Sequence, residues 1–589
     1  MTAFSDRVDA FLDAMFALDP LFATRVGNHA HDSSWPDLSA AGRERRLAFA
    51  AEWSAAFGAF DDDELSGDER IDRDVVLGEL ASLAFGDREL REDAWSPMWW
   101  VYAIGEGLFD LLAREFAPLG ERLTSLAARA EGIPAVLAAA REVLVGIAGR
   151  PVDRLHAEKA LEQWPGLISI VDEAIEAGES AAAAGDPPAG AVLPRLRIAR
   201  QTAGDALAGF ETHLRDNLVP ASVGEGRLGP ELFAARMAHT MRDPGMTPER
   251  IRERAEREYG TVRAEMIRVA REIAPHWLGS DPGSIRAADD ELVRAVLGAI
   301  ATEHPGPTEL IDFCRTELER IETFCRDRDL VGLSDEPLEI SWTPLFLRAS
   351  GGAMLSSPGP LDLGQKAMFL ITPVDDDATP ERVESHLRED NDRMLRLLTI
   401  HEAVPGHYLQ GVYANRSPSI VRTIFWSGVY AEGWAVYVTE VMMDAGYGAD
   451  DPALLLTHWK FYLRSITNAL IDVGIHAGAM TEAEAVALMV DGGFQEEAEA
   501  RAKFDRARLT STQLSTYFVG SLEFWDLEDE VRRRRAAASG DSRGKNAVPR
   551  PRVVGGYGET PGFVYREHLE ACLNHGSLPL PLLRRRLLD

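Results

Sequence analysis

The amino-acid sequence predicts a mainly α-helical protein with a small β-sheet or hairpin in its middle. Thr247, followed by a proline and an acidic residue, opens a helix that we expect to run to about Pro275. Thr379 opens another in the same way, and we expect it to continue to Ala403. Thr481 begins a capping box, the third helix signal of this kind. No internal repeat of solenoid length is visible, so these helices predict a large helical body.

Strand signals are confined mostly to residues 338–374. There LEISWTPLFL and KAMFLITPV carry β-branched and aromatic residues between Gly- and Pro-rich segments. Residues 178–192 are rich in Ala, Gly and Pro and predict a connection between two parts of the chain. We therefore expect an N-terminal helical part, residues 1–185, and a catalytic helical part, residues 186–589.

Composition limits the possible partners. The 589 residues include 62 basic and 95 acidic side chains, a formal net charge of −33. This charge argues against sequence-independent binding of nucleic acid or an anionic membrane, because surfaces that bind phosphate are basic. Three cysteines are too few for a disulfide framework, and no apolar stretch approaches the ~18 residues of a membrane span. The N-terminus lacks a signal-peptide pattern, so we expect a cytoplasmic protein.

One stretch, residues 401–432, carries groups suited to metal chemistry. His401, Glu402 and His407 lie in IHEAVPGHY, and Glu432 follows in AEGWAVY. Catalytic zinc sites use three protein ligands and leave a position for water. Two histidines and a glutamate are such a set, and a carboxylate beside the first histidine can act as general base on the metal-bound water. The pattern predicts one Zn²⁺ ion, although other divalent metals accept the same ligands.

The two histidines are six residues apart, whereas the usual zinc motif places them four apart on one helix face. On a straight helix, six residues at about 100° each leave His407 roughly 120° away from the face of His401. Pro405 and Gly406 offer a remedy, because proline breaks the helical hydrogen bonding and glycine permits conformations closed to other residues. We expect the pair to bulge out of the helix and to restore the approach of the two imidazoles.

These motifs resemble signatures of the bacterial family called "domain of unknown function 885": HEAVPGHYLQ, EGWAVY, and LIDVGIH with the following MTEAEAVALM. The resemblance extends over most of the chain, from DPLFATRVGNHAHD to NHGSLPLPLL. That family is similar to the helical zinc metallopeptidases, the group of thimet oligopeptidase, angiotensin-converting enzyme and the thermostable carboxypeptidases. The resemblance implies a metallopeptidase-like helical body with a deep cleft, zinc at its floor and hydrolysis of short peptides.

At the matching positions, the resemblance implies that His401 and His407 ligate zinc, with Glu432 completing the set from a separate helix. Glu402 is then the general base. Glu440 lies eight residues beyond Glu432, on roughly the same helix face. It either orients a ligand histidine or is a solvated acid.

Groups that stabilise a transition state are also predicted. Tyr517, in LSTYFVG, is a candidate donor to the oxyanion, with a surface tyrosine as the alternative. His476 and Asp472 are four residues apart on one helix face, where they form either a catalytic histidine with its orienting carboxylate or a structural pair. Arg464, two turns earlier, is a candidate for binding the C-terminus of a peptide.

Other segments are assigned structural roles or differ from the family. Trp434 and Tyr437 are expected to pack in the core. Met354 and Leu355 lie where the family commonly has a tyrosine-rich segment, so a substrate contact made there in the family does not carry over. Residues 536–562 predict a long surface loop or a lid.

Three functions fit these observations. The first is a zinc metallopeptidase that cleaves short peptides by Glu402-assisted attack of water. The second is another metal-dependent reaction, on a non-peptide amide or a carbon–heteroatom bond, because a metal site does not name its substrate. The third is a non-catalytic helical binding protein. The oligomeric state does not follow from the sequence.

Overall fold

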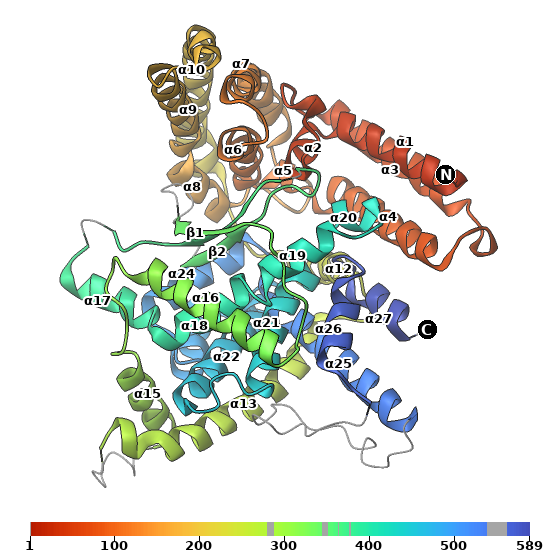
Figure 1. Ribbon diagram of the computed structural model, residues 1–589. Coiled ribbons are helices and arrows are strands. Elements are labelled where there is room, and N and C mark those ends of the chain that lie inside the picture. Colours follow the sequence, from red (N-terminus) through yellow and green to blue (C-terminus); the bar gives the residue numbers. More distant parts are fainter. Residues whose placement is uncertain are drawn as a thin grey trace. The chain divides into compact units, whose positions relative to one another are not determined.

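A computed structural model describes residues 2–279, 288–343, 352–362, 364–375, 378–538 and 562–588 of the chain. Within these ranges the protein is mainly α-helical with one three-stranded sheet (Figure 1), which confirms the expected fold class. Most of the predicted loop or lid at residues 536–562 lies outside the described residues.

The chain divides into two compact units. The first contains Met1–Arg227 and Pro358–Gln365, and the second contains Leu228–Ser357 and Lys366–Asp589. The boundary expected near residue 185 lies inside the first unit, where a short turn joins two long helices.

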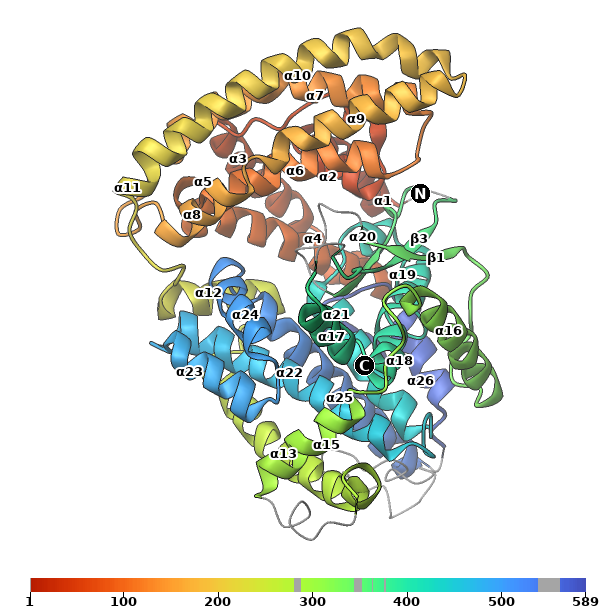
Figure 2. The same ribbon diagram turned by 90° about the vertical axis from the view of Figure 1, so that its left-hand side faces the viewer.

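The first unit consists of helices. Its longer ones are α1 (Ala3–Leu18), α2 (Pro20–Val26), α3 (Ala40–Gly58), α4 (Gly67–Phe85), α6 (Pro97–Ala113), α7 (Leu119–Val143), α8 (Arg154–Gln163), α9 (Gly166–Ala183) and α10 (Pro187–His213). Shorter turns of helix are η1 (His29–His31), η2 (Asp62–Glu64), η3 (Gly86–Leu90), α5 (Glu92–Trp95), η4 (Leu214–Leu218) and α11 (Val219–Ala221). α7 and α9 both pack against α10 and α6, and Figure 2 shows α7, α9 and α10 side by side.

An inserted segment, Pro358–Gln365, is anchored to the start of the first unit. The Leu361 N–H donates to the carbonyl of Val26. The imidazole of His29 lies between two carboxylates, with Nδ1 2.9 Å from Asp32 and Nε2 2.8 Å from Asp362. Burial lowers the pKa of His29, but the two carboxylates outweigh it and raise that pKa to about 9. The histidine is therefore a charged link between distant parts of the sequence.

The second unit contains the sheet and the remaining helices. Its helices are α12 (Pro230–Met241), α13 (Pro248–Trp277), α15 (Asp289–Ile300), α16 (Leu310–Asp327), α17 (Pro380–Glu389), α18 (Asp392–Glu402), α19 (His407–Asn415), α20 (Ile420–Ile424), α21 (Gly428–Asp444), α22 (Pro452–His476), α23 (Glu482–Ala487), η6 (Leu488–Gly492), α24 (Glu497–Leu509), α25 (Gln513–Ala538), α26 (Tyr565–Leu573) and α27 (Leu580–Leu588). The sheet contains β1 (Leu338–Trp342), β2 (Ala353–Ser356) and β3 (Ala367–Ile371).

The three predicted helix starts are confirmed, but one predicted helix is two. Thr247, Thr379 and Thr481 each cap a helix by accepting a backbone N–H, and Thr481 forms the expected capping box. The expected continuous helix from Thr379 to Ala403 was wrong, because the chain turns between α17 and α18. The Asn391 side chain accepts the N–H groups of Arg393 and Met394 and so caps α18 as a new helix.

The sheet differs from a simple hairpin. β1 and β3 are the two predicted strands, and they run parallel, while β2 pairs antiparallel with β3 at the other edge. β2 contains Met354 and Leu355, in the stretch that departs from the family pattern, and no strand was expected there. Ile340 and Phe369 share a core cluster with residues of α16 and α18, and β2 also contacts α18. The sheet thus supports the helix that ends at the candidate metal residues.

Two glycines set the approach of α21 and α25. A Cβ on Gly433 would lie 2.3 Å from a backbone carbon of Gly520, and a Cβ on Gly520 would lie 2.2 Å from the Val429 carbonyl oxygen. Any larger side chain would push the two helices apart. This contact brings Glu432 of α21 and Tyr517 of α25 toward the same region.

Cys314, Cys325 and Cys572 are all buried, and none of them forms a disulfide. In the described part of the chain, none of the helices combines the length and the apolar character that a membrane crossing requires.

The His29 link predicts a pH-dependent stability. A histidine whose pKa is raised on folding stabilises the folded state fully below its unfolded pKa of about 6.5, and loses that contribution as the pH rises through about 9. We expect the difference in Tm between the wild type and a His29→Gln variant to shrink from pH 6.5 to pH 9.5 in thermal melts. A His31→Gln variant is the control and should show no such trend. A constant difference for His29→Gln across this range would contradict the charged link.

Candidate metal centre

The two motif histidines lie on different helices. α18 ends at Glu402, and α19 begins at His407, so His401 is in the last turn of one helix and His407 is the first residue of the next. The expected bulge within one helix is therefore a complete break. The break still has the expected result, because the two imidazole rings lie 4.8 Å apart between centroids, at 87° to each other.

Gly406 is required by the shape of this break. Its N–H donates to the carbonyl of Ile400, and a Cβ on Gly406 would lie 1.9 Å from the His401 carbonyl oxygen and 2.3 Å from that of Ile400. No other residue fits this approach of backbone to backbone. On the other side, the Trp434 indole N–H donates to the Pro405 carbonyl over 2.8 Å. Trp434 is fully buried on α21, so the break is attached to the helix that carries Glu432.

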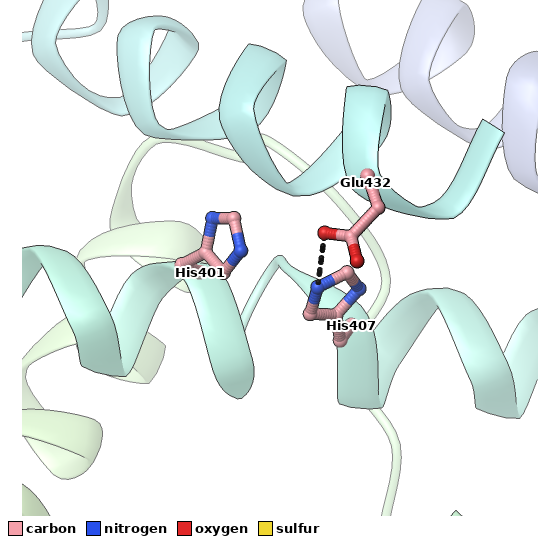
Figure 3. Close-up of side chains that lie close together, drawn as sticks. All are labelled: His401, His407 and Glu432. Atoms are coloured by element: carbon pink, nitrogen blue, oxygen red, sulfur yellow. Dashed lines mark ion pairs between the residues drawn. The ribbon is translucent and has the colours of Figure 1, made fainter. Parts of the chain in front are cut away.

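His401, His407 and Glu432 converge on one point (Figure 3). One potential ligand atom of each lies within 4.8 Å of those of the other two. The His407 Nε2 is 3.5 Å from Glu432 Oε2. Among the described residues, this is the one group of three or more His, Cys, Asp or Glu side chains with such spacing.

The chemical types of these groups suit a metal ion. Burial lowers the pKa of His401 well below its usual value, and the nearby His407 lowers it further, so His401 is neutral. The buried Nδ1 of His401 has no hydrogen-bond partner among the described residues. Burial also lowers the pKa of His407, but Glu432 outweighs it and raises that pKa. A neutral imidazole, a second imidazole and a carboxylate are ligands that zinc accepts, so the donor set fits.

Glu402 is buried beside this group. Burial and the charge of Glu432 raise its pKa, and His407 and a backbone hydrogen bond from Leu355 lower it. The net result is a pKa of about 7. Leu355 belongs to β2, so the unexpected strand provides a backbone contact to this carboxylate. A carboxyl group with a pKa near neutrality can both accept and donate a proton at pH 7.

Tyr517 lies near Glu432 on α25. Burial raises the pKa of its phenol, and the negative charge of Glu432 raises it further, so the hydroxyl keeps its proton. The Gln513 side chain amide donates to the Tyr517 hydroxyl over 3.2 Å, and Arg506 donates to the Gln513 carbonyl oxygen over 3.1 Å. Sequence reasoning missed Gln513 and Arg506. The four-residue spacing of Gln513 and Tyr517 was the available signal.

His476 and Asp472 have structural contacts away from this group. His476 Nε2 donates to the Ala507 carbonyl over 2.8 Å, Nδ1 accepts the Leu228 N–H, and the ring stacks on Phe233. Because both ring nitrogens bond to the backbone, the structure favours the structural alternative for His476 over a catalytic role.

Asp472 lies 3.9 Å from His476 Nε2, as a pair, and it also holds the start of α25. Its carboxylate accepts the backbone N–H of Thr512 and both the N–H and the hydroxyl of Ser515. Burial raises its pKa to about 7 despite these hydrogen bonds. The next turn of α25 carries Tyr517, so Asp472 positions that residue from α22.

The other predicted residues are buried or paired. Glu440 is 2% exposed, so the alternative that it is a solvated acid was wrong. It does not belong to the group formed by His401, His407 and Glu432. Trp434 and Tyr437 are fully buried, as expected, and the Tyr437 hydroxyl donates to Glu528 over 2.5 Å. Arg464 forms ion pairs with Glu389 and Glu499.

The fold and the site define a mainly helical protein with a candidate metal centre at a break between two helices. The sequence matches the family described as "Bacterial protein of unknown function (DUF885)" over residues 20–587, and the chain belongs to this family. A proposed lipoprotein of unknown function from Shewanella oneidensis is 30% identical, with a TM-score of 0.81 and 100% of both chains covered. A proposed lipoprotein from Colwellia psychrerythraea is 15% identical, with a TM-score of 0.78 over 100% of this chain and 98% of that one, and shows the fold alone. None of the curated proteins matches the chain.

We expect the addition of one methyl group at Gly406 to lower stability and zinc binding strongly. Gly406→Ala should lower the free energy of unfolding by at least about 1–3 kcal/mol, because the Cβ has no room, and should weaken zinc binding. Gly428→Ala, at the start of α21, is the matched control, since nothing lies within 4 Å of its Cβ. Chemical denaturation and zinc titration of both variants measure these effects. Wild-type stability and zinc affinity in Gly406→Ala would show that the break tolerates a side chain.

Proposed function

We propose that this protein is a zinc-dependent hydrolase, a metallopeptidase acting on short peptides. The single observation that carries the proposal is the convergence of His401, His407 and Glu432 beside the buried carboxyl group of Glu402. These three residues would hold the ion. A bound Zn²⁺ supplies Lewis acidity, which polarises the carbonyl group of a substrate.

Glu402 acts as the general base in this proposal. It takes a proton from the attacking water and later delivers it to the nitrogen of the leaving amine. Its buried position directly after the ligand His401 supports both steps. A site that only held a metal in place would not need a second carboxyl group, that of Glu402, beside the three ligands.

Tyr517 donates a hydrogen bond to the oxyanion that develops during attack. Its raised pKa keeps the proton on the hydroxyl, and its place near Glu432 would bring the donor close to an ion held by that residue. Arg506 and Gln513 orient the phenol through the hydrogen bonds described above.

The peptide substrate is the finer part of the proposal. It is supported only through the family that HEAVPGH and EGWAVY resemble, which is itself similar to the helical zinc metallopeptidases, while the names of the two compared structures state no activity. The net charge of −33 favours a small substrate over nucleic acid. Hydrolysis of non-peptide amides but not of peptides would assign the same site to a different substrate.

Two substitutions test the mechanism. Glu402→Gln should keep the metal and lose nearly all turnover, by at least about 10²-fold, since it removes the proton acceptor. His401→Ala should lose both. Metal content by elemental analysis and hydrolysis of a peptide library measure the two effects.

Glu249→Gln, which changes an exposed residue of α13, is the control and should retain both properties. A fully active Glu402→Gln protein would rule out the mechanism. A wild-type protein that takes up no zinc when it is supplied would favour the non-catalytic alternative.

Tyr517→Phe tests the oxyanion donor. We expect kcat to fall by about 10²–10³-fold with a small change in KM, because the hydrogen bond strengthens only in the transition state. Circular dichroism and thermal melts should match the wild type. A change confined to KM would assign Tyr517 to substrate binding instead.

A further inference from the structure

A cluster of five charged side chains lies on one side of α22. Arg464 donates to Glu389 over 3.0 Å and also to Glu499. Lys460 is 3.3 Å from Glu389, and Lys503 is 3.2 Å from Glu499. Helices α17, α22 and α24 therefore meet through alternating charges, and we call these five residues the α22 charge cluster.

The α22 charge cluster carries one positive charge more than it carries negative charges. Three cations, Arg464, Lys460 and Lys503, face two carboxylates, Glu389 and Glu499. Asp390 also interacts with Arg464, but its nearest ion-pair partner is His386, 3.3 Å away, so it is counted with that histidine. Excess charge in a largely buried site is costly unless an ion of opposite charge joins it.

The pKa of Lys503 is also affected by the excess of positive charge. Burial and the positive charge of Arg464 lower the pKa of Lys503 to about 8, although Glu499 opposes the change. Lysine is also rare in this chain, with five residues among 62 basic side chains, and two of the five belong to this cluster. The lysine ammonium is a compact charge on a flexible side chain, so it can move to meet a ligand. The planar guanidinium group of arginine is rigid.

The cluster is mostly buried, but part of it reaches the surface. Lys460 and Lys503 keep 12% and 9% of their side chains exposed, whereas Arg464, Glu389 and Glu499 keep 25–26%. One turn of α22 before Arg464, the Phe461 ring lies 5.5 Å from that of His401. Tyr517 is near enough to interact electrostatically with both Glu432 and Arg464. The cluster therefore lies on the same stretch of α22 as a residue that contacts the candidate ligand His401.

We infer that the α22 charge cluster binds a carboxylate group of the substrate, which is held there while another part of the molecule reaches the metal centre. The inference rests on the proposed function and names its substrate class: short peptides with a carboxylate near the scissile bond. Either the C-terminal carboxylate or an acidic side chain supplies this chemistry.

Calorimetry with small probes tests the inference without turnover. Hippurate, a blocked glycine with a free carboxylate, should bind the full-length protein, and hippuramide, its uncharged amide, should bind at least about tenfold more weakly. Aspartate blocked at both backbone ends presents the carboxylate on a side chain only. Tighter binding of hippurate than of this compound assigns the site to a C-terminus, and the reverse assigns it to an acidic residue.

Two variants should shift hippurate binding in opposite directions. Arg464→Gln removes the excess charge and should weaken binding about tenfold, whereas Glu499→Gln raises the excess and should tighten it several-fold. Structural damage alone would weaken both. Arg393→Gln, which breaks a comparably buried pair with Asp451 and Glu303, is the control and should bind as the wild type does.

Equal binding of hippurate and hippuramide, binding of neither, or a shift of the same sign in Arg464→Gln and Glu499→Gln would overturn the inference. A protein that binds hippurate as expected but hydrolyses no peptide would contradict the proposed function and leave the carboxylate site intact.

Discussion

The candidate centre depends on how closely the backbone of Gly406 packs against the end of α18. That contact lets one helix stop at Glu402 and another start at His407, so that two imidazoles six residues apart face each other. The hydrogen bond from Trp434 to Pro405 then connects the break to α21. Because Glu432 is on that helix two residues earlier, a single arrangement of backbone and indole places all three potential ligands.

α22 plays an equally central part in the second unit. Along its length it presents Phe461 to His401, Arg464 to a set of carboxylates, and Asp472 to the start of α25. Asp472, which was expected either to orient a histidine or to form a structural pair with it, thus supports the helix that carries Tyr517. Packing of α21 on α25 through two glycines completes the frame. The chemistry of the site therefore rests on helices whose own ends are held by buried polar groups.

Local signals predicted the local features well. The threonine caps, the two strands of LEISW and AMFLI, and the close approach of His401 and His407 all follow from residues within a few positions of each other. Asn391 was itself a cap signal, but it lay inside a continuous helical pattern and was overlooked. What the sequence could not reveal is long-range. The pairing of β2, the backbone partners of His476 and the burial of Glu440 depend on segments far away in the chain, and one sequence holds no record of those contacts.

The path of the chain between β2 and β3 limits how this protein can be divided. Pro358–Gln365 leaves the second unit, joins the first through Val26 and His29, and returns. The two units are consequently not consecutive segments of the chain, since the polypeptide passes between them three times. A fragment that begins at Leu228 would retain an excursion whose folding partner is missing. Evolution by exchange of whole modules, and expression of the second unit by simple truncation, are both obstructed by this topology.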